Sequence, residues 1–183
     1  FLTLALVLIL KIIFYDLSTI SNDDAIAYVK IANNIFEKSI ISVDGTHDYV
    51  TFPPGYPLII GLEKLVFRTW GNVFFFNYFI IGTLTSVLIA SFFKSHFPEW
   101  YHNSFSPFIV LYPVFITGRS ILHLSSEYVF MFYIWIGIYF LFEFLFNKNQ
   151  VKLLLTSNAF FAFSYLIRPE GIILYCLSGL YTI

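Results

Sequence analysis

Long apolar runs separated by short polar clusters make up most of this chain. A helix needs about 20 apolar residues to cross a bilayer, and residues 73–93 and 126–146 have about that length. The pattern predicts an all-α, polytopic transmembrane helical bundle with about six spans. The expected spans are residues 1–15, 73–93, 104–117, 126–146 and 153–167, with an unfinished run after Gly171. Because the first run is short and the last is interrupted, we interpret residues 1–183 as one membrane-embedded domain truncated at both ends.

The longest polar interval, residues 16–52, follows the first apolar run and is expected to form the first exoplasmic loop. Ser21 can cap a helix whose first turn holds Asp23 and Asp24, where the helix dipole favours negative charge. The polar side chains Lys30, Asn33, Asn34 and Glu37 line one face of this helix, and Ala25, Val29, Ala32 and Phe36 line another. This pattern predicts an amphipathic helix lying in the membrane interface.

Residues 53–57, Pro-Pro-Gly-Tyr-Pro, are predicted not to be regular helix, because proline favours extended geometry in its predecessor. They form either a rigid turn back into the membrane or one wall of a substrate cleft in which Tyr56 stacks on a sugar or lipid. The apolar run 57–67 that follows is too short to span and is expected to be interfacial or partly inserted.

The composition limits the class of protein. Hydrophobic residues make up 58% of the chain and charged residues 11%, with a mean hydropathy of +0.79. A soluble domain carries about 25% charged residues, so an integral membrane protein is predicted. The net charge of −1 gives no reason to expect nucleic acid as a partner. The single cysteine, Cys176, excludes an internal disulfide and a cysteine-based metal site.

Successive turns of such a bundle lie on alternate sides of the bilayer. One side receives Lys94, His96, Lys148 and Lys152, and the positive-inside rule makes it cytoplasmic. The other side receives the aspartate pair, the proline-rich segment and the clusters at 119–127 and 168–171. We therefore expect a multi-pass protein of the plasma (inner) membrane whose site faces the exoplasmic side. Glu143 falls on the lysine side and is excluded from that site.

Three polar clusters are candidates for chemistry. Asp23 and Asp24 either cap an interfacial helix or supply a general base at the membrane surface. Arg119, His123 and Glu127 share one helical face if their helix is continuous, and ionisable groups at membrane depth are often functional. An Arg–Glu pair joining two helices is the alternative for that cluster, and no spacing supports His123 as a zinc ligand.

The third cluster is Arg168-Pro169-Glu170-Gly171. Pro169 and Gly171 are explained by a helix break, whereas the Arg168 guanidinium suits a lipid phosphate held through two hydrogen bonds. Asp44, His47 and Asp48 form a further acidic patch that either is a solvated loop or holds a metal or an acceptor. No cofactor is required, and a divalent metal is possible but unsupported.

Four features in this order resemble the GT-C superfamily of polytopic glycosyltransferases, in particular family 39 protein mannosyltransferases, aminoarabinose transferases and their RgtA/B/C/D-like bacterial relatives. They are Asp23-Asp24-Ala25 with Tyr28 and Ala32, the segment 53–57, Ser125-Ser126-Glu127, and Arg168-Pro169-Glu170-Gly171. The resemblance runs through nearly the whole chain, which would be the N-terminal part of such an enzyme.

The resemblance implies transfer of a sugar, with inversion, from a polyprenyl-phosphate donor to a hydroxyl of a glycan, lipid or protein. Asp24 or Asp23 would be the base; the family often shows Asp-Glu here. Arg168, Glu170, Arg119, His123, Glu127 and Tyr56 are the expected substrate-binding residues. Two alternatives remain open: a transporter or flippase for a lipid-linked or small anionic solute, and a non-catalytic scaffold. A transporter predicts paired broken helices and repeat symmetry, which the sequence does not show.

Overall fold

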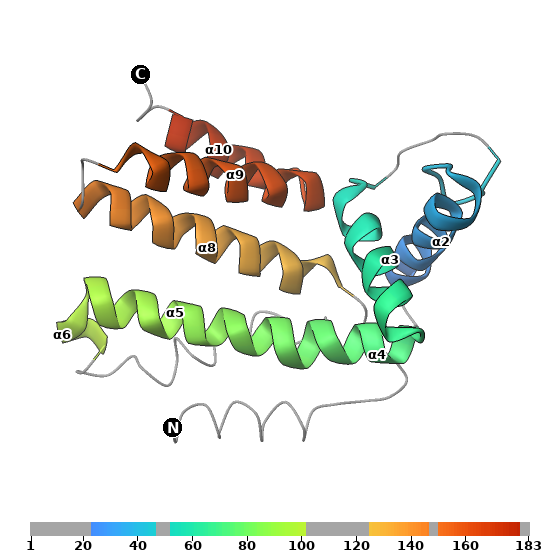
Figure 1. Cartoon of the computed structure of the whole chain (residues 1–183), viewed down its shortest axis with the longest axis horizontal. Coiled ribbons are helices and arrows are strands. Elements are labelled where there is room, and N and C mark those ends of the chain that lie inside the picture. Colours follow the sequence, from blue (N-terminus) through green and yellow to red (C-terminus); the bar gives the residue numbers. More distant parts are fainter. Residues whose placement is uncertain (1–22, 47–51, 102–124, 147–149, 180–183) are drawn as a thin grey trace.

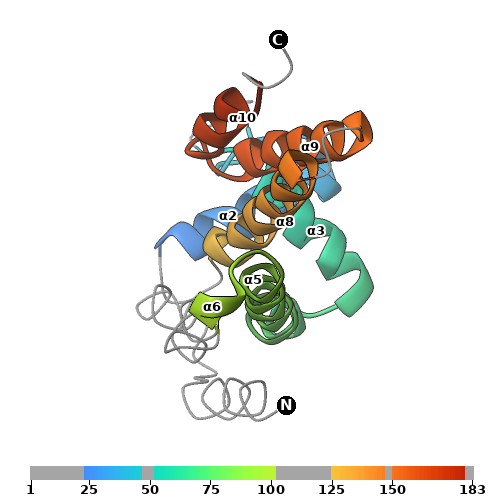
Figure 2. The ribbon, with the colours of Figure 1, turned by 90° about the vertical axis from the view of Figure 1, so that its left-hand side faces the viewer.

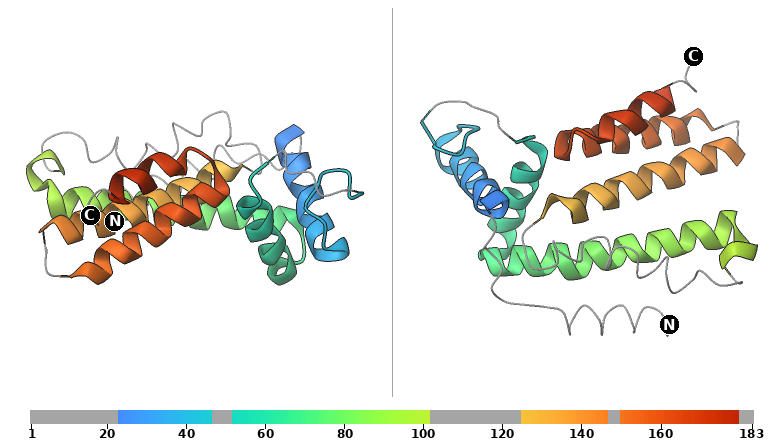
Figure 3. Two further views of the ribbon diagram at one scale, coloured as in Figure 1. Left: turned by 90° about the horizontal axis from the view of Figure 1, so that it is seen from above. Right: turned by 180° about the vertical axis from the view of Figure 1, so that it is seen from behind.

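The computed structural model describes residues 23–46, 52–101, 125–146 and 150–179, and the regular secondary structure in these ranges is helical (Figure 1). The helices α5 (Gly82–His96), α8 (Ser126–Phe146) and α9 (Val151–Ile167) lie side by side, and α10 (Gly171–Gly179) packs on α9. Figure 2 shows the same four helices stacked in the order α5, α8, α9, α10. The pair α2 (Asp23–Lys38) and α3 (Gly55–Phe67) lies across one end of this stack, as both views of Figure 3 show.

The first long apolar helix is continuous from Trp70 to His96 but changes pitch along its length. It comprises α4 (Trp70–Phe75), a π-helical segment η1 (Phe76–Ile81) and α5, and the short α6 (Pro98–Trp100) follows. The Thr69 side chain caps its start by accepting a hydrogen bond from the Asn72 amide at 3.2 Å. In η1 the Gly82 amide donates to the Asn77 carbonyl five residues earlier. The predicted span at 73–93 is therefore confirmed as a helix and is longer than expected.

Two helices of the described ranges, Trp70–His96 and Ser126–Phe146, are long and apolar enough to cross a membrane. The second has the bounds that the sequence predicted. The expectation of about six spans is wrong for the described residues, because α9 has 17 residues and α10 has nine. At 1.5 Å per residue α9 is about 26 Å long, against about 30 Å of hydrocarbon in a bilayer. The expected spans at 1–15 and 104–117 lie outside the described residues.

Helix α2 forms where its pattern predicted, and its first turn holds Asp23 and Asp24. Its apolar face packs on α3 and the neighbouring helices, burying Ala25, Tyr28 and Ala32. The Phe36 ring lies over the backbone of α3 at Gly61, where an added Cβ would meet the ring at 2.2 Å. Protein therefore covers much of the face that was expected to rest on lipid.

The segment 53–57 differs from its prediction. Helix α3 begins at Gly55, and the Leu58 amide donates to the Pro54 carbonyl at 3.0 Å. Pro57 is therefore helical, because amides in the first turn have no partner within the helix and proline loses nothing there. Gly55 allows α3 to approach the end of α9: a Cβ at this position would lie 2.5 Å from the Leu166 carbonyl oxygen.

Candidate functional site

The polar clusters from distant parts of the chain meet at the end of the helix stack that α2 and α3 cover (Figure 1). The N-terminus of α8, the C-terminus of α9 and the turn into α10 all lie at this end. Of the expected site residues, Asp23, Asp24, Tyr56, Glu127, Arg168 and Glu170 lie in the elements that meet there. Arg119 and His123 lie outside the described residues.

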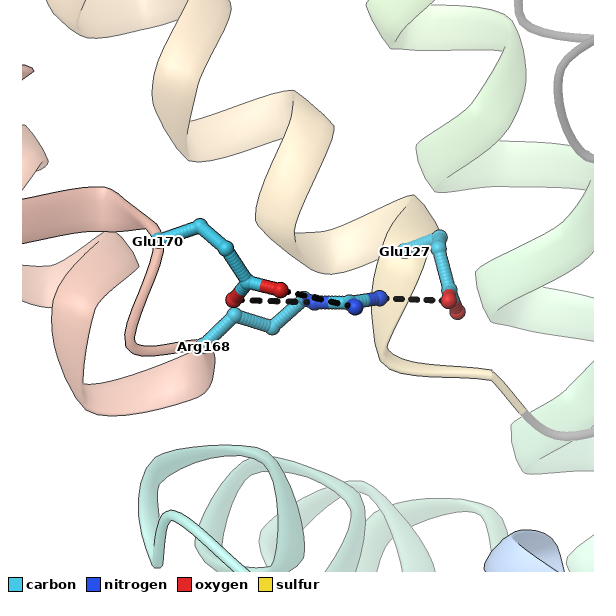
Figure 4. A network of polar contacts seen from close by, with 3 residues as sticks. All are labelled: Glu127, Arg168 and Glu170. Atoms are coloured by element: carbon cyan, nitrogen blue, oxygen red, sulfur yellow. Dashed lines mark hydrogen bonds and ion pairs between the residues drawn. The ribbon is translucent and has the colours of Figure 1, made fainter. Parts of the chain in front are cut away.

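Arg168 is the centre of an ionic network between α8 and the α9–α10 turn (Figure 4). Its backbone is extended and ends α9, so the side chain leaves the helix and reaches Glu127 in the first turn of α8. Nη1 of Arg168 pairs with Oε1 of Glu127. On the other side Nη2 and Nε donate to the two carboxylate oxygens of Glu170 at 3.1 and 3.5 Å. The arginine is thus held between two acids.

This network pairs one basic side chain with two acidic side chains. Partial burial lowers the Arg168 pKa, but the hydrogen bond to Glu170 and the charge of Glu127 outweigh it, and the net shift is upward. The hydrogen bond from Arg168 holds the pKa of Glu170 below its usual value. The side chains of Arg168, Glu127 and Glu170 are 30%, 36% and 57% exposed. One positive and two negative charges give the cluster a net charge of −1, and Glu170 is its most accessible member.

Glu127 was expected to share a helical face with Arg119 and His123, provided that their helix was continuous. Helix α8 starts at Ser126, and because Arg119 and His123 lie outside the described residues, the shared face stays a prediction. The alternative of an Arg–Glu pair joining two helices fits Glu127, although its partner is Arg168. The sequence offered no direct signal for this pairing, because the two residues are 41 positions apart.

Tyr28 connects the aspartate pair to the ionic network. It lies one turn after Asp24 in α2 and is buried, and the Ser126 side chain at the start of α8 acts to lower its pKa. Burial raises its pKa, and the charges of Asp24, Glu127 and Arg168 all act on it. Asp23 and Asp24 themselves are exposed in the first turn of α2. The sequence pointed to Tyr28 only through the family resemblance. Its position on the apolar face of α2, one turn after Asp24, could have identified it as a residue that lies between the acids and the core.

Tyr56 does not lie where a stacking wall requires it. It is fully buried, and its ring meets Tyr28 edge to face with centroids 4.9 Å apart. It therefore has no open face for a sugar or lipid, and the expectation of stacking is wrong in this structure. The cause is the helical start of α3, which turns Tyr56 inward. Its buried hydroxyl has no hydrogen-bond partner within the described part of the chain, and burial, followed by the charge of Glu63, raises its pKa well above the usual value.

The residues described here offer no obvious metal centre. Across residues 23–46, 52–101, 125–146 and 150–179, no group of three or more His, Cys, Asp or Glu side chains could hold a metal ion. Asp44 accepts hydrogen bonds from Ser42 Oγ at 2.9 Å and the Thr46 amide at 3.0 Å, which shapes its own loop. The other members of that acidic patch, His47 and Asp48, lie outside the described residues.

Comparison of the chain with family models, with curated proteins and with solved structures finds no match.

Proposed function

We propose that this chain is part of an inverting glycosyltransferase that moves a sugar from a polyprenyl-phosphate donor to an acceptor hydroxyl. The observation that carries the proposal is that Tyr28, one turn after the exposed aspartates of α2, has its pKa shifted by the charges of both Asp24 and Arg168. It joins groups suited to accepting a proton with a group suited to holding a phosphate. The motifs that resemble the GT-C superfamily contain these same residues.

In the proposed reaction the acceptor oxygen attacks the anomeric carbon as its proton passes to Asp24 or Asp23. The bond from that carbon to the phosphate oxygen breaks, and the polyprenyl phosphate leaves with the electron pair. Arg168 stabilises the charge that grows on this phosphate. Such preorganised electrostatic stabilisation is usually the largest contribution in sites of this kind.

The geometry of the network supports one way in which Arg168 would bind a phosphate. Its bonds to Glu170 lie at the most exposed part of the network, since the side chain of Glu170 is 57% exposed and that of Glu127 is 36% exposed. A phosphate would therefore replace Glu170 on Nη2 and Nε while Glu127 keeps Nη1 in place. Since a phosphate presents two oxygens to a guanidinium as a carboxylate does, the exchange conserves the hydrogen bonds.

We place the reaction at the exoplasmic surface of the plasma membrane, with α5 and α8 in the bilayer. Two long apolar helices support this placement. The lysines at the far end of the stack, Lys94 in α5 and Lys152 in α9, would then face the cytoplasm.

The test is a transfer assay on the full-length protein in membranes, with radiolabelled polyprenyl-phosphate hexose and pentose donors. Asp23→Asn combined with Asp24→Asn should abolish transfer and leave membrane insertion intact. Glu37→Gln, an exposed acid at the other end of α2, is the control and should keep wild-type turnover. Unchanged turnover in the double variant would end the assignment.

A transporter remains the second candidate because of one observation. The first long apolar helix contains the π-helical segment Phe76–Ile81, and irregular helices that carry polar residues occur in transport pathways. Uptake of labelled polyprenyl phosphate into proteoliposomes, with no transfer of sugar, would favour this function over the first.

A further inference from the structure

A second polar contact lies away from the ionic network, between α3 and the first long helix. Glu63 sits within an apolar stretch of α3 and is partly buried. Its Oε2 accepts a hydrogen bond from Asn77 Nδ2 at 2.6 Å. Asn77 belongs to the π-helical segment and is only 1% exposed. A carboxyl group in such surroundings needs either a counter-charge or a proton.

The orientation of the Asn77 amide is fixed from two sides. Its Nδ2 also donates to the Val73 carbonyl at 3.0 Å, so a flipped amide would place two carbonyl oxygens against each other. In the orientation observed, Oδ1 is buried and has no hydrogen-bond donor among the described residues. Buried acceptors are nearly always paired, so one hydrogen bond is missing beside Glu63.

The described residues supply no counter-charge for Glu63. The neighbouring Lys64 turns away: its Nζ donates to the Arg68 carbonyl and lies 5.6 Å from the centre of the Trp70 ring. Arg168 is held by its own two glutamates. The ionisable groups of the packed helices α2 and α9 are Asp23, Asp24, Tyr28, Lys30, Glu37, Lys38, Lys152 and Tyr165. None of these has a resolved effect on the Glu63 pKa, for which only burial and the Asn77 hydrogen bond count.

The groups that do respond to Glu63 are phenols. Its charge raises the pKa of Tyr56, two turns earlier on α3. The charge of Glu63 also acts on the Tyr133 hydroxyl of α8. Burial raises the pKa of Glu63 itself to about 7, although the Asn77 hydrogen bond opposes the shift.

We propose that Glu63 and Asn77 form a proton-binding site in which the protonated carboxyl pairs with the amide through two hydrogen bonds. Asn77 Nδ2 donates to one oxygen of the acid, and the acid hydroxyl donates to Asn77 Oδ1. The first bond is present in the structure, and the second supplies the donor that Oδ1 lacks. A carboxylic acid and a primary amide have matching donors and acceptors for this pair. The proton comes from water, and no other group changes its charge.

The site would couple protonation to the packing of α3. The neutral pair holds α3 against the first long helix, and the same α3 carries Tyr56 against Tyr28 at the other candidate site. Loss of the proton places a negative charge in this contact. The inference does not depend on glycosyl transfer.

Infrared spectroscopy of the full chain in lipid nanodiscs tests the site directly. The protonated Glu63 carboxyl should give a C=O band that disappears with a midpoint at about pH 7. Glu63→Gln should remove this band completely, and Glu37→Gln, an exposed glutamate on α2, should leave it unchanged. In Asn77→Leu the band should persist at a higher wavenumber, because the carboxyl loses its amide partner.

Three results would overturn the proposal. One is a titrating band that survives in Glu63→Gln, and another is a Glu63 midpoint below about pH 5, near that of a free glutamate. The third is a band that keeps its wavenumber in Asn77→Leu. Folding gives an independent check: glutamine copies the neutral acid and can form both bonds to Asn77, so Glu63→Gln should fold as the wild type does. Failure of this variant to fold would also contradict the pair.

Discussion

Helix α8 carries a glutamate near each end, and the two glutamates have different partners. Glu127, in the first turn, meets Arg168, which also binds Glu170. Glu143, near the last turn, lies 3.5 Å from His96 of α5, and the His96 side chain is only 5% exposed. Aromatic rings surround this histidine: Phe92, Tyr139, Phe142 and Phe146 all lie within ring contact of it.

The difference shows where a charged ligand could be bound. At the Glu127 end, three ionisable groups from two segments, the start of α8 and the α9–α10 turn, remain partly open to solvent. At the Glu143 end, aromatic rings cover His96, so the contact between His96 and Glu143 helps to hold α5 against α8. Both ends contain acids and bases, but only the first leaves its base accessible: the Arg168 side chain is 30% exposed and that of His96 is 5% exposed. We therefore expect chemistry at the α2 end and a structural role at the other.

The largest effect is expected at Gly137, where α8 packs closely against α9. A Cβ there would meet the buried Phe161 ring of α9 at 2.5 Å, and Ser157 Oγ donates to the Gly137 carbonyl at 2.8 Å. Gly137→Leu should lower the free energy of unfolding by about 3 kcal/mol or more. Thermal unfolding of the chain in nanodiscs measures this. Gly71→Leu is the matched control, since its Cβ would enter open space; equal losses in both variants would show that α8 and α9 are not closely packed.

The next effect is expected at Arg168. Arg168→Gln leaves Glu127 and Glu170 without their counter-charge and should lower the free energy of unfolding by about 1–2 kcal/mol, allowing for solvent screening. Glu170→Gln should lower it less, because Glu170 is the most exposed member of the network. Denaturant unfolding compares the two. If Glu170→Gln lowered the free energy of unfolding more than Arg168→Gln does, Glu127 would not be the main structural partner of Arg168.

The contributions of Glu170 and Glu63 to the free energy of unfolding should depend on pH with opposite signs. Arg168 lowers the Glu170 pKa, so the stability it contributes is present above the pKa of the unfolded chain and is lost as the pH falls. The Glu63 pKa is raised from 4.5 to about 7, so its contribution is complete below 4.5 and is lost as the pH rises to about 7. The unfolding midpoint of the wild type should therefore fall as the pH rises from 4.5 to about 7, and the midpoint of Glu63→Gln should not show this fall. A decline that persists in this variant would assign it to another group.

The smallest effect is expected at the closed end. Glu143→Gln changes one polar contact to His96 and should change the free energy of unfolding by at most about 1 kcal/mol. It should leave the activity of the α2 end unchanged, measured with the same transfer assay. A loss of activity comparable with that of Arg168→Gln would remove the distinction between the two ends.

Local patterns predicted much of the helical framework. The bounds of α8 followed from a long, predominantly apolar run, and α2 followed from its amphipathic face and its acidic first turn. The same reasoning failed at residues 53–57. The prolines were predicted to exclude regular helix, but they lie at the start of α3, where proline is tolerated. It also counted spans from apolar runs alone, although α9 and α10 are shorter than the two helices that are long enough to cross a membrane.

The sequence by itself determined that the chain forms apolar helices joined by polar turns, because hydrophobicity and helix signals act over a few neighbouring residues. Only the tertiary structure decided which polar groups meet. Glu127 finds Arg168 across 41 residues, and Glu63 finds Asn77 across 14. Each contact depends on how far a helix is rotated about its axis, and the π-helical segment changes that rotation within a single helix. Periodicity fixes the faces of a helix, but packing selects the neighbour that each face meets.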